Sequence, residues 1–365
     1  MSQTANVEAV KGETLADGGI LSKIKKLPIS TTAVGGLYIL FMIIGAVSGV
    51  SVPFLFSFTF MALGMHGILV LSNVPSIQAG MGPNFALPIG VVSGHLAMVM
   101  TMGWIGLEGW ALIIVAAMIA IVIGCIFGYL YGRLMNATKG SEMAIAPYTG
   151  FAITFAFSVV WQVIPIDNVY MTFFLGDGLR TPIALQPFGV DTILSDFLRF
   201  SVFGVTIPTG SLLVLAVFCF GMWMFFRSKT GIAMSAVGAN PMFAKATGLN
   251  VDRLRIFAMM ISTSVAAVGI IVFAQGMGIL ALYDAPLWMG FPAVAAILVG
   301  GASAQRAKVQ NVLIGTFLFQ GLISIAMPVL TGVLPPGTDV ADPLRMVIQN
   351  AVILYALTRM AGGGK

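Results

Sequence analysis

The chain has 365 residues, of which 58% are apolar and only 8% are charged, and its mean hydropathy is +1.01. Soluble domains are about 45–50% apolar and about 25% charged, so this composition excludes a soluble protein and predicts an all-α, polytopic membrane protein. The net charge of +5 comes from Lys and Arg residues scattered among the predicted loops, a pattern typical of membrane topology rather than of nucleic-acid binding.

Residues 1–32 form a polar N-terminal segment with several charged side chains, among them Glu8, Lys11 and Asp17. The segment lacks an apolar run followed by a small-residue cleavage site, so it does not have the pattern of a signal peptide. We expect it to be retained, partly disordered and cytoplasmic, ahead of a transmembrane domain over residues 33–361.

Long apolar runs follow, and a run of about 20 residues is enough to cross a bilayer as a helix. The predicted helices lie near residues 33–50, 54–72, 83–103, 109–132, 142–162, 208–226, 254–274, 287–303, 309–330 and 343–360. About ten crossings place both termini in the cytoplasm. This topology agrees with the positive-inside rule, because most Lys and Arg residues then lie on the cytoplasmic side and most Asp residues on the other.

The stretch between the second and third predicted helices, 73–90, is rich in Gly and Pro and holds polar side chains. Irregular backbone is tolerated at membrane depth only where it is buried in protein or lines an aqueous cavity. We expect either a pathway wall with Gln78, Asn84 and Ser93 as candidate lining residues, or an ordinary loop beside close helix packing. A broken helix is an alternative to a simple loop here.

Two histidines, His66 and His95, lie inside predicted membrane helices. Polar groups at this depth are costly, so each histidine either lines the pathway or forms a hydrogen bond between helices. No carboxylate is securely placed in the middle of the membrane, whereas an ion-coupled carrier normally needs such groups. The energy source for any transport is therefore expected outside this chain.

Two connections are too long to be simple turns. The predicted external connection, 163–207, contains the run DTILSDFLRF, which has the pattern of a short amphipathic helix lying along the membrane surface. The predicted cytoplasmic loop, 227–255, carries Ala, Met, Phe and Val where a disordered segment would be polar. We expect this loop to fold against another part of the assembly.

Within this loop, the run AVGAN over 236–240, followed by Ala244 and by GLNV over 248–251, is similar to the cytoplasmic loop of the ribose-type permease family of ATP-binding-cassette importers. Further similarities to this family are ALGM at 62–65, VGGAS at 299–303 and GT at 315–316. The resemblance runs from about residue 54 to residue 357. It implies the membrane-spanning subunit of an importer in the bacterial inner membrane.

The resemblance also implies partners: ATPase subunits on the cytoplasmic face, a second permease subunit that is identical or homologous, and an extracytoplasmic solute-binding protein. Local signals agree, because Asn240 can cap a short helix over 241–247 that starts with a proline and stops at a glycine. Such a helix would present Met242, Phe243 and Lys245 to an ATPase. The candidate coupling residues are Gly238, Asn240, Met242, Phe243, Ala244, Lys245, Gly248 and Asn250. A self-contained cytoplasmic hairpin is the alternative.

Enzyme signatures are absent from the sequence: it has no phosphate-binding loop, no H-E-x-x-H pattern and no G-x-S-x-G elbow. Cys125 and Cys219 lie in separate apolar runs and predict neither a disulfide nor a metal site. We expect no catalytic residue, metal or cofactor in this chain. The favoured solute is a small neutral one, a simple sugar first, then a nucleoside, then a branched-chain amino acid. A secondary carrier and an intramembrane enzyme or scaffold are the competing classes.

Overall fold

The computed structural model describes residues 28–173, 178–335 and 339–362, so the predicted segment 1–32 falls almost entirely outside the described residues. Within the described residues, the first half of the chain forms five longer helices and one short helix, α5. These are α3 (Ile29–Val47), α4 (Val52–Leu71), α5 (Asn73–Gln78), α6 (Pro88–Met100) with a π-helical turn at Thr101–Ile105, α7 (Gly109–Ala137) and α8 (Glu142–Val163).

The second half begins with short elements and continues as helices. The short elements are β1 (Pro182–Ala184), a 3-10 turn at Gln186–Phe188, α9 (Ile193–Asp196), β2 (Phe200–Val202) and β3 (Val205–Ile207). The remaining elements are α10 (Thr209–Arg227), α11 (Lys229–Ala239), α12 (Pro241–Ala246), α13 (Val251–Met277), β4 (Ile279–Ala281), α14 (Ala285–Val299), α15 (Val309–Gly315), a π-helical turn at Thr316–Gln320, α16 (Gly321–Val333) and α17 (Ala341–Gly362).

All ten predicted segments are helical, and the all-α membrane fold is confirmed. Within the described ranges, eight helices are long and apolar enough to cross a membrane, while α14, with 15 residues, is a shorter apolar helix. The strands add only the antiparallel pairs β1–β4 and β2–β3. The count of ten crossings and the cytoplasmic placement of both termini remain predictions.

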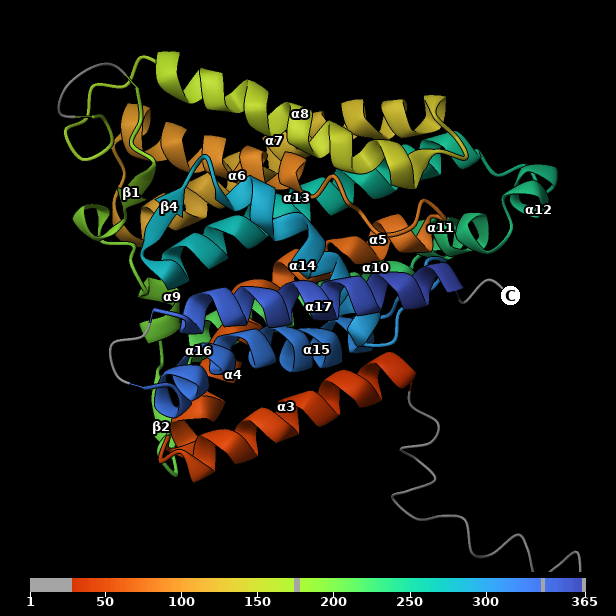
Figure 1. Ribbon diagram of the computed structural model, residues 1–365. Coiled ribbons are helices and arrows are strands. Elements are labelled where there is room, and N and C mark those ends of the chain that lie inside the picture. The colour runs from red at the N-terminus through yellow and green to blue at the C-terminus, as the bar shows by residue number, and fades with distance from the viewer. Residues whose placement is uncertain (1–27, 174–177, 336–338, 363–365) are drawn as a thin grey trace, which may run out of the picture.

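The long helices run side by side, and the connections gather at the two ends of the bundle (Figure 1). β1, β4, α9 and β2 lie at one end. α11 and α12 lie at the opposite end, from which α12 projects. The predicted external connection 163–207 and the predicted cytoplasmic loop 227–255 are therefore at opposite ends of the molecule.

Two local expectations were wrong. The third helix begins at Pro88 rather than near residue 83, because Gly80 and Gly82 adopt left-handed backbone conformations after the short helix α5. The predicted amphipathic helix DTILSDFLRF is helical only over Ile193–Asp196. Beyond it the chain turns at Leu198, which has a φ of 53°, and pairs as the hairpin β2–β3. Only Phe200, the last residue of the run, pairs in this hairpin, so the helix is ended by the extended Phe197 and the left-handed Leu198.

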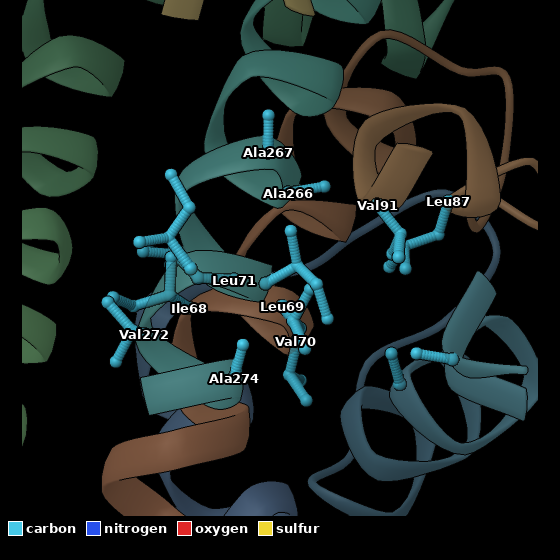
Figure 2. Close-up of a cluster of buried hydrophobic side chains, with 14 of the residues drawn as sticks. Ile68, Leu69, Val70, Leu71, Leu87, Val91, Ala266, Ala267, Val272 and Ala274 are labelled. Atoms are coloured by element: carbon cyan, nitrogen blue, oxygen red, sulfur yellow. The ribbon is translucent and has the colours of Figure 1, made fainter. Parts of the chain in front are cut away.

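α13 is the central helix and packs against α4, α6 and α7. Figure 2 shows part of this core, in which Ile68, Leu69 and Val70 of α4 lie near Ala266 and Val272 of α13. By contrast, only 17% of the apolar stretch of α8 is buried, compared with 72% for α13. Most of α8 therefore lies exposed on the surface of the chain.

Glycines allow the backbones of α7 and α13 to approach closely. A Cβ atom added to Gly124, Gly128 or Gly132 would lie 2.7–2.8 Å from a backbone Cα atom of α13. The three glycines are four residues apart, so they form one stripe on α7, which is the usual way in which membrane helices pack tightly. This stripe fixes α7 on one side of the central helix.

Candidate functional site

The short helix α12 is built by local signals. Asn240 has an extended backbone, and its side-chain oxygen accepts a hydrogen bond from the backbone N–H of Phe243 at 3.0 Å. Pro241 occupies the first turn, where a missing N–H costs nothing, and Gly248 follows the helix with a φ of +87°. The structure thus agrees with the predicted start and stop of this helix.

α12 exposes two large apolar side chains. Met242 is 82% exposed and Phe243 is 64% exposed, whereas the next residue, Ala244, is buried. Lys245 is exposed and lines a shallow hollow of about 600 Å³ together with Gly248 and Asn250. An exposed apolar pair on a capped helix that projects from the bundle is a typical protein-contact surface.

α11 anchors this helix to the membrane bundle. Met234 and Val237 on α11 are fully buried, and Gly238 packs directly on the end of α5. A Cβ atom on Gly238 would lie 2.2 Å from the carbonyl oxygen of Gln78, and one on Gly80 would lie 2.9 Å from the Cα atom of Gly238. Because these backbones are in direct contact, a displacement of α11 must also move the segment 78–80.

Ion pairs hold the other side of the loop. Arg255, near the start of α13, pairs with Glu142 at the start of α8, and both side chains are largely buried. Lys139 pairs with Asp252 nearby, and the Asn136 side chain donates a hydrogen bond to the Asp252 carbonyl at 2.9 Å. Asn250 caps α13 by accepting from the Arg253 N–H. The loop 227–255 is thus an ordered structure fixed at several points.

A cavity of about 450 Å³ opens between α4, α13, α14, α16 and α17. Its wall is mainly apolar, and His66 lies in it with its ring 4.9 Å from that of Phe273. The polar side chains that share the cavity with His66 are Gln320, Ser324, Arg345 and Gln349. Such a mainly apolar cavity with a few convergent polar groups is typical of small-molecule sites.

The sequence reasoning missed the four polar residues that accompany His66. Gln320 and Gln349 interrupt the apolar runs of the last two predicted helices, which is the signal that could have identified them. Arg345 is paired with Asp342 at 2.6 Å, so the cavity carries no uncompensated charge from this group. The chemistry of the wall therefore fits a neutral solute.

The other candidate pathway residues lie outside this cavity. The Gln78 amide donates to the carbonyl of Ala307 at 2.5 Å, and the Asn84 amide donates to the Ser262 hydroxyl at 2.9 Å. Ser93 donates to the Ile89 carbonyl within its own helix. His95 is fully buried on α6, and its ring nitrogens make no hydrogen bond to the described part of the chain. A pathway role for these four residues remains a prediction.

Comparison with known proteins now decides the family. The family described as the permease component of branched-chain amino acid transport systems matches residues 55–357, well over half of the chain. This chain belongs to that family. The resemblance to a permease family, noted from the loop 236–251, is confirmed.

One curated relative of this permease-family chain is the guanosine ABC transporter permease protein NupQ of Bacillus subtilis. It is 25% identical over 152 residues, which are 42% of this chain and 46% of that protein. The chain therefore aligns with about half the length of this relative. No solved structure matches the chain. Family membership and the apolar helices identify a multi-pass protein of the bacterial inner membrane.

Proposed function

We propose that this chain is the membrane-spanning permease subunit of an ATP-binding-cassette importer, and that α12 is the helix through which it is coupled to an ATPase. The observation that carries the proposal is the exposed pair Met242 and Phe243 on a capped helix anchored to the bundle. The path of coupling runs from α12 through α11 to the close contact between Gly238 and Gly80. ATP hydrolysis is assigned to the separate ATPase subunits.

The proposed solute is small, polar and neutral, with a simple sugar first and a nucleoside second. The cavity around His66 supports a neutral solute, because its wall offers amides and a hydroxyl while Arg345 is already paired. The similarity to a guanosine permease supports the nucleoside alternative, and the family description supports a branched-chain amino acid as the third. The paired charge argues against the amino acid, whose two charged groups need partners of both signs.

The proposed assembly contains two permease subunits, identical or homologous, together with ATPase subunits and an extracytoplasmic binding protein. The cavity around His66 is open on one side, and exposed Trp288 lies on its wall. A second permease subunit would close such a wall. Transport without ATPase subunits is the competing function, but among the described residues that line the cavity there is no Asp or Glu to bind a coupling ion.

Co-purification tests this proposal. Tagged protein in mild detergent is expected to bring down an ATPase subunit, and the double variant Met242→Asp, Phe243→Asp is expected to lose it, because two carboxylates disrupt an apolar contact. The control is Phe203→Asp, an aromatic that is 96% exposed in the hairpin β2–β3 at the opposite end of the molecule. An ATPase that stays bound to the double variant, or is absent from folded wild type, contradicts the role assigned to α12.

A further inference from the structure

A second cavity, of about 380 Å³, lies beside the cavity around His66, at the end of the molecule predicted to be external. It is enclosed by the start of α4, by α9 and by the hairpin β2–β3. Hydroxyl and charged side chains gather on its wall: Ser51, Ser57, Thr192, Ser195, Asp196, Arg199 and Thr206. This wall is more polar than that of the cavity around His66.

Ser195 is the unusual member of this wall. Its side chain is only 6% exposed, and its hydroxyl makes no hydrogen bond to the described residues. Leaving a buried polar group unpaired costs about 1–3 kcal/mol, so proteins seldom keep one without a reason. Ser195 lines the cavity, but its oxygen is covered by neighbouring atoms, so the hydroxyl reaches a ligand there only after the side chain rotates.

The charged members are positioned beside Ser195. Asp196 accepts a hydrogen bond from the Thr192 hydroxyl at 2.6 Å and pairs with Arg199 at 3.0 Å. The Thr192 hydrogen bond and the Arg199 guanidinium hold the pKa of the Asp196 carboxyl below its usual range. This carboxylate is therefore ionised at neutral pH, and its second lone pairs can accept further hydrogen bonds.

The turn that carries these groups is held rigidly. The backbone N–H groups of Thr192 and Leu194 donate to the carbonyl and the side-chain oxygen of Gln275 on α13, at 2.7 and 3.1 Å. Thr192 itself has a left-handed backbone, with a φ of 52°, which is rare for a branched residue. Strained residues of this kind concentrate at binding sites, where the surroundings hold them in place.

We propose that this hydroxyl-lined cavity is an external entry site that binds the vicinal hydroxyl groups of a neutral polyhydroxylated solute, a sugar or the ribose of a nucleoside. After rotating toward the cavity, the Ser195 side chain receives one hydroxyl and the Asp196 carboxylate receives the other, while Arg199 balances the charge of Asp196. Phe58 and Met61 line both cavities, so they form the partition across which the solute passes toward His66. The direction of passage rests on the proposed importer function, whereas the binding itself does not.

The test is a saturation-transfer NMR titration of the full chain in lipid nanodiscs, without ATPase or binding protein. The probes are methyl ribofuranoside, inosine and 2′,3′-dideoxyinosine, which lacks the vicinal hydroxyls. We expect at least one of the first two to bind and the dideoxy compound to bind at least tenfold more weakly. Ser195→Ala and the isosteric Asp196→Asn are each expected to weaken binding about tenfold, whereas the control Ser201→Ala, exposed on β2 and outside the cavity, leaves it unchanged.

Binding of methyl ribofuranoside alone assigns the site to simple sugars, and binding of inosine assigns it to nucleosides; either result supports the proposal. Equal binding of the dideoxy compound, unchanged binding by both variants, or no binding of any probe at millimolar concentration overturns it. The titration contains no ATPase subunits. A failure of the co-purification experiment would therefore not change what the titration says about solute binding. The entry site and the importer function can therefore fail separately.

Discussion

Asn240 connects α11 to α12 and supplies the only side-chain cap that the described residues show for α12. Its oxygen satisfies the Phe243 N–H, which otherwise has no partner in the first turn. We therefore expect the side chain to act on the helix itself, by capping it, rather than by contacting an ATPase. Its removal should make α12 less stable while leaving the exposed side chains Met242 and Phe243 in place.

Asn240→Ala is expected to destabilise α12 by about 1 kcal/mol, because a capping side chain is worth about that much. In the assembled importer, solute-stimulated ATPase activity should fall several-fold while Met242 and Phe243 remain present. Asn240→Asp keeps the capping oxygen and is the control, expected to retain activity. Equal losses in both variants would assign Asn240 a direct contact instead of a capping role.

Glu142 and Arg255 form an ion pair whose side chains are only 14% and 9% exposed. The pair joins the start of α8 to the start of α13. Breaking a buried pair leaves one charge without a partner, which is more costly than removing both charges.

Arg255→Met is expected to destabilise the chain by about 1–3 kcal/mol, since the partly buried Glu142 then keeps only the hydrogen bond from the Gly140 N–H. The double variant Glu142→Gln, Arg255→Met should recover most of this loss. Thermal unfolding in detergent measures both. A single variant as stable as the wild type would show that the pair contributes nothing to the fold.

At the scale of elements, the glycine stripe of α7 decides how closely α7 and α13 pack. Gly128 lies at its centre, where an added Cβ atom would meet the Cα atom of Met260 at 2.7 Å. Backbone atoms cannot move aside as a flexible side chain can, so any larger residue must push the helices apart. The stripe is therefore a packing device and not a flexible hinge.

Gly128→Leu is expected to destabilise the fold by about 1–3 kcal/mol or more, the usual cost of overpacking. Gly221→Leu on α10 is the matched control, because a Cβ atom there meets nothing within 4 Å. Unfolding midpoints in the same detergent compare the two. If both substitutions had the same effect, helix propensity rather than packing would explain the result.

At the scale of the whole molecule, the two ends of the bundle carry different chemistry. One end holds the hydroxyl-lined cavity and the hairpin β2–β3, and the opposite end holds α11 and α12 (Figure 1). The distribution of Lys and Arg predicts that α12 faces the cytoplasm. The proposed path of the solute and the proposed ATPase contact then lie on opposite sides of the membrane.

Cysteine labelling tests this orientation. In a background with Cys125→Ala and Cys219→Ala, Phe203→Cys is expected to react with a membrane-impermeant maleimide in intact spheroplasts. Met242→Cys should react only after permeabilisation. Both positions are highly exposed in the folded chain, so a difference in labelling reports the side of the membrane rather than burial. The reverse pattern would invert the topology and remove α12 from the ATPase side.

Local signals in the sequence determined where the helices lie and how α12 starts and stops. Apolar runs of sufficient length predicted the ten helical segments, and Asn240, Pro241 and Gly248 predicted the short helix, because capping and backbone conformation depend on neighbouring residues. The pattern of the run DTILSDFLRF predicted too long a helix, since the backbone turns at Phe197 and Leu198 and only Phe200 pairs with β3.

Only the tertiary structure decided which polar residues meet. His66 and Gln349 belong to helices far apart in the chain and share one cavity, while Asn84 and Ser93, close to His66 in sequence, lie outside it. The turn that carries the buried, unpaired Ser195 hydroxyl is held by Gln275 on α13, whose side chain accepts from the Leu194 N–H. No local sequence pattern encodes this contact. Long-range packing sets which side chains face a cavity, whereas composition and periodicity set only the membrane helices that enclose it.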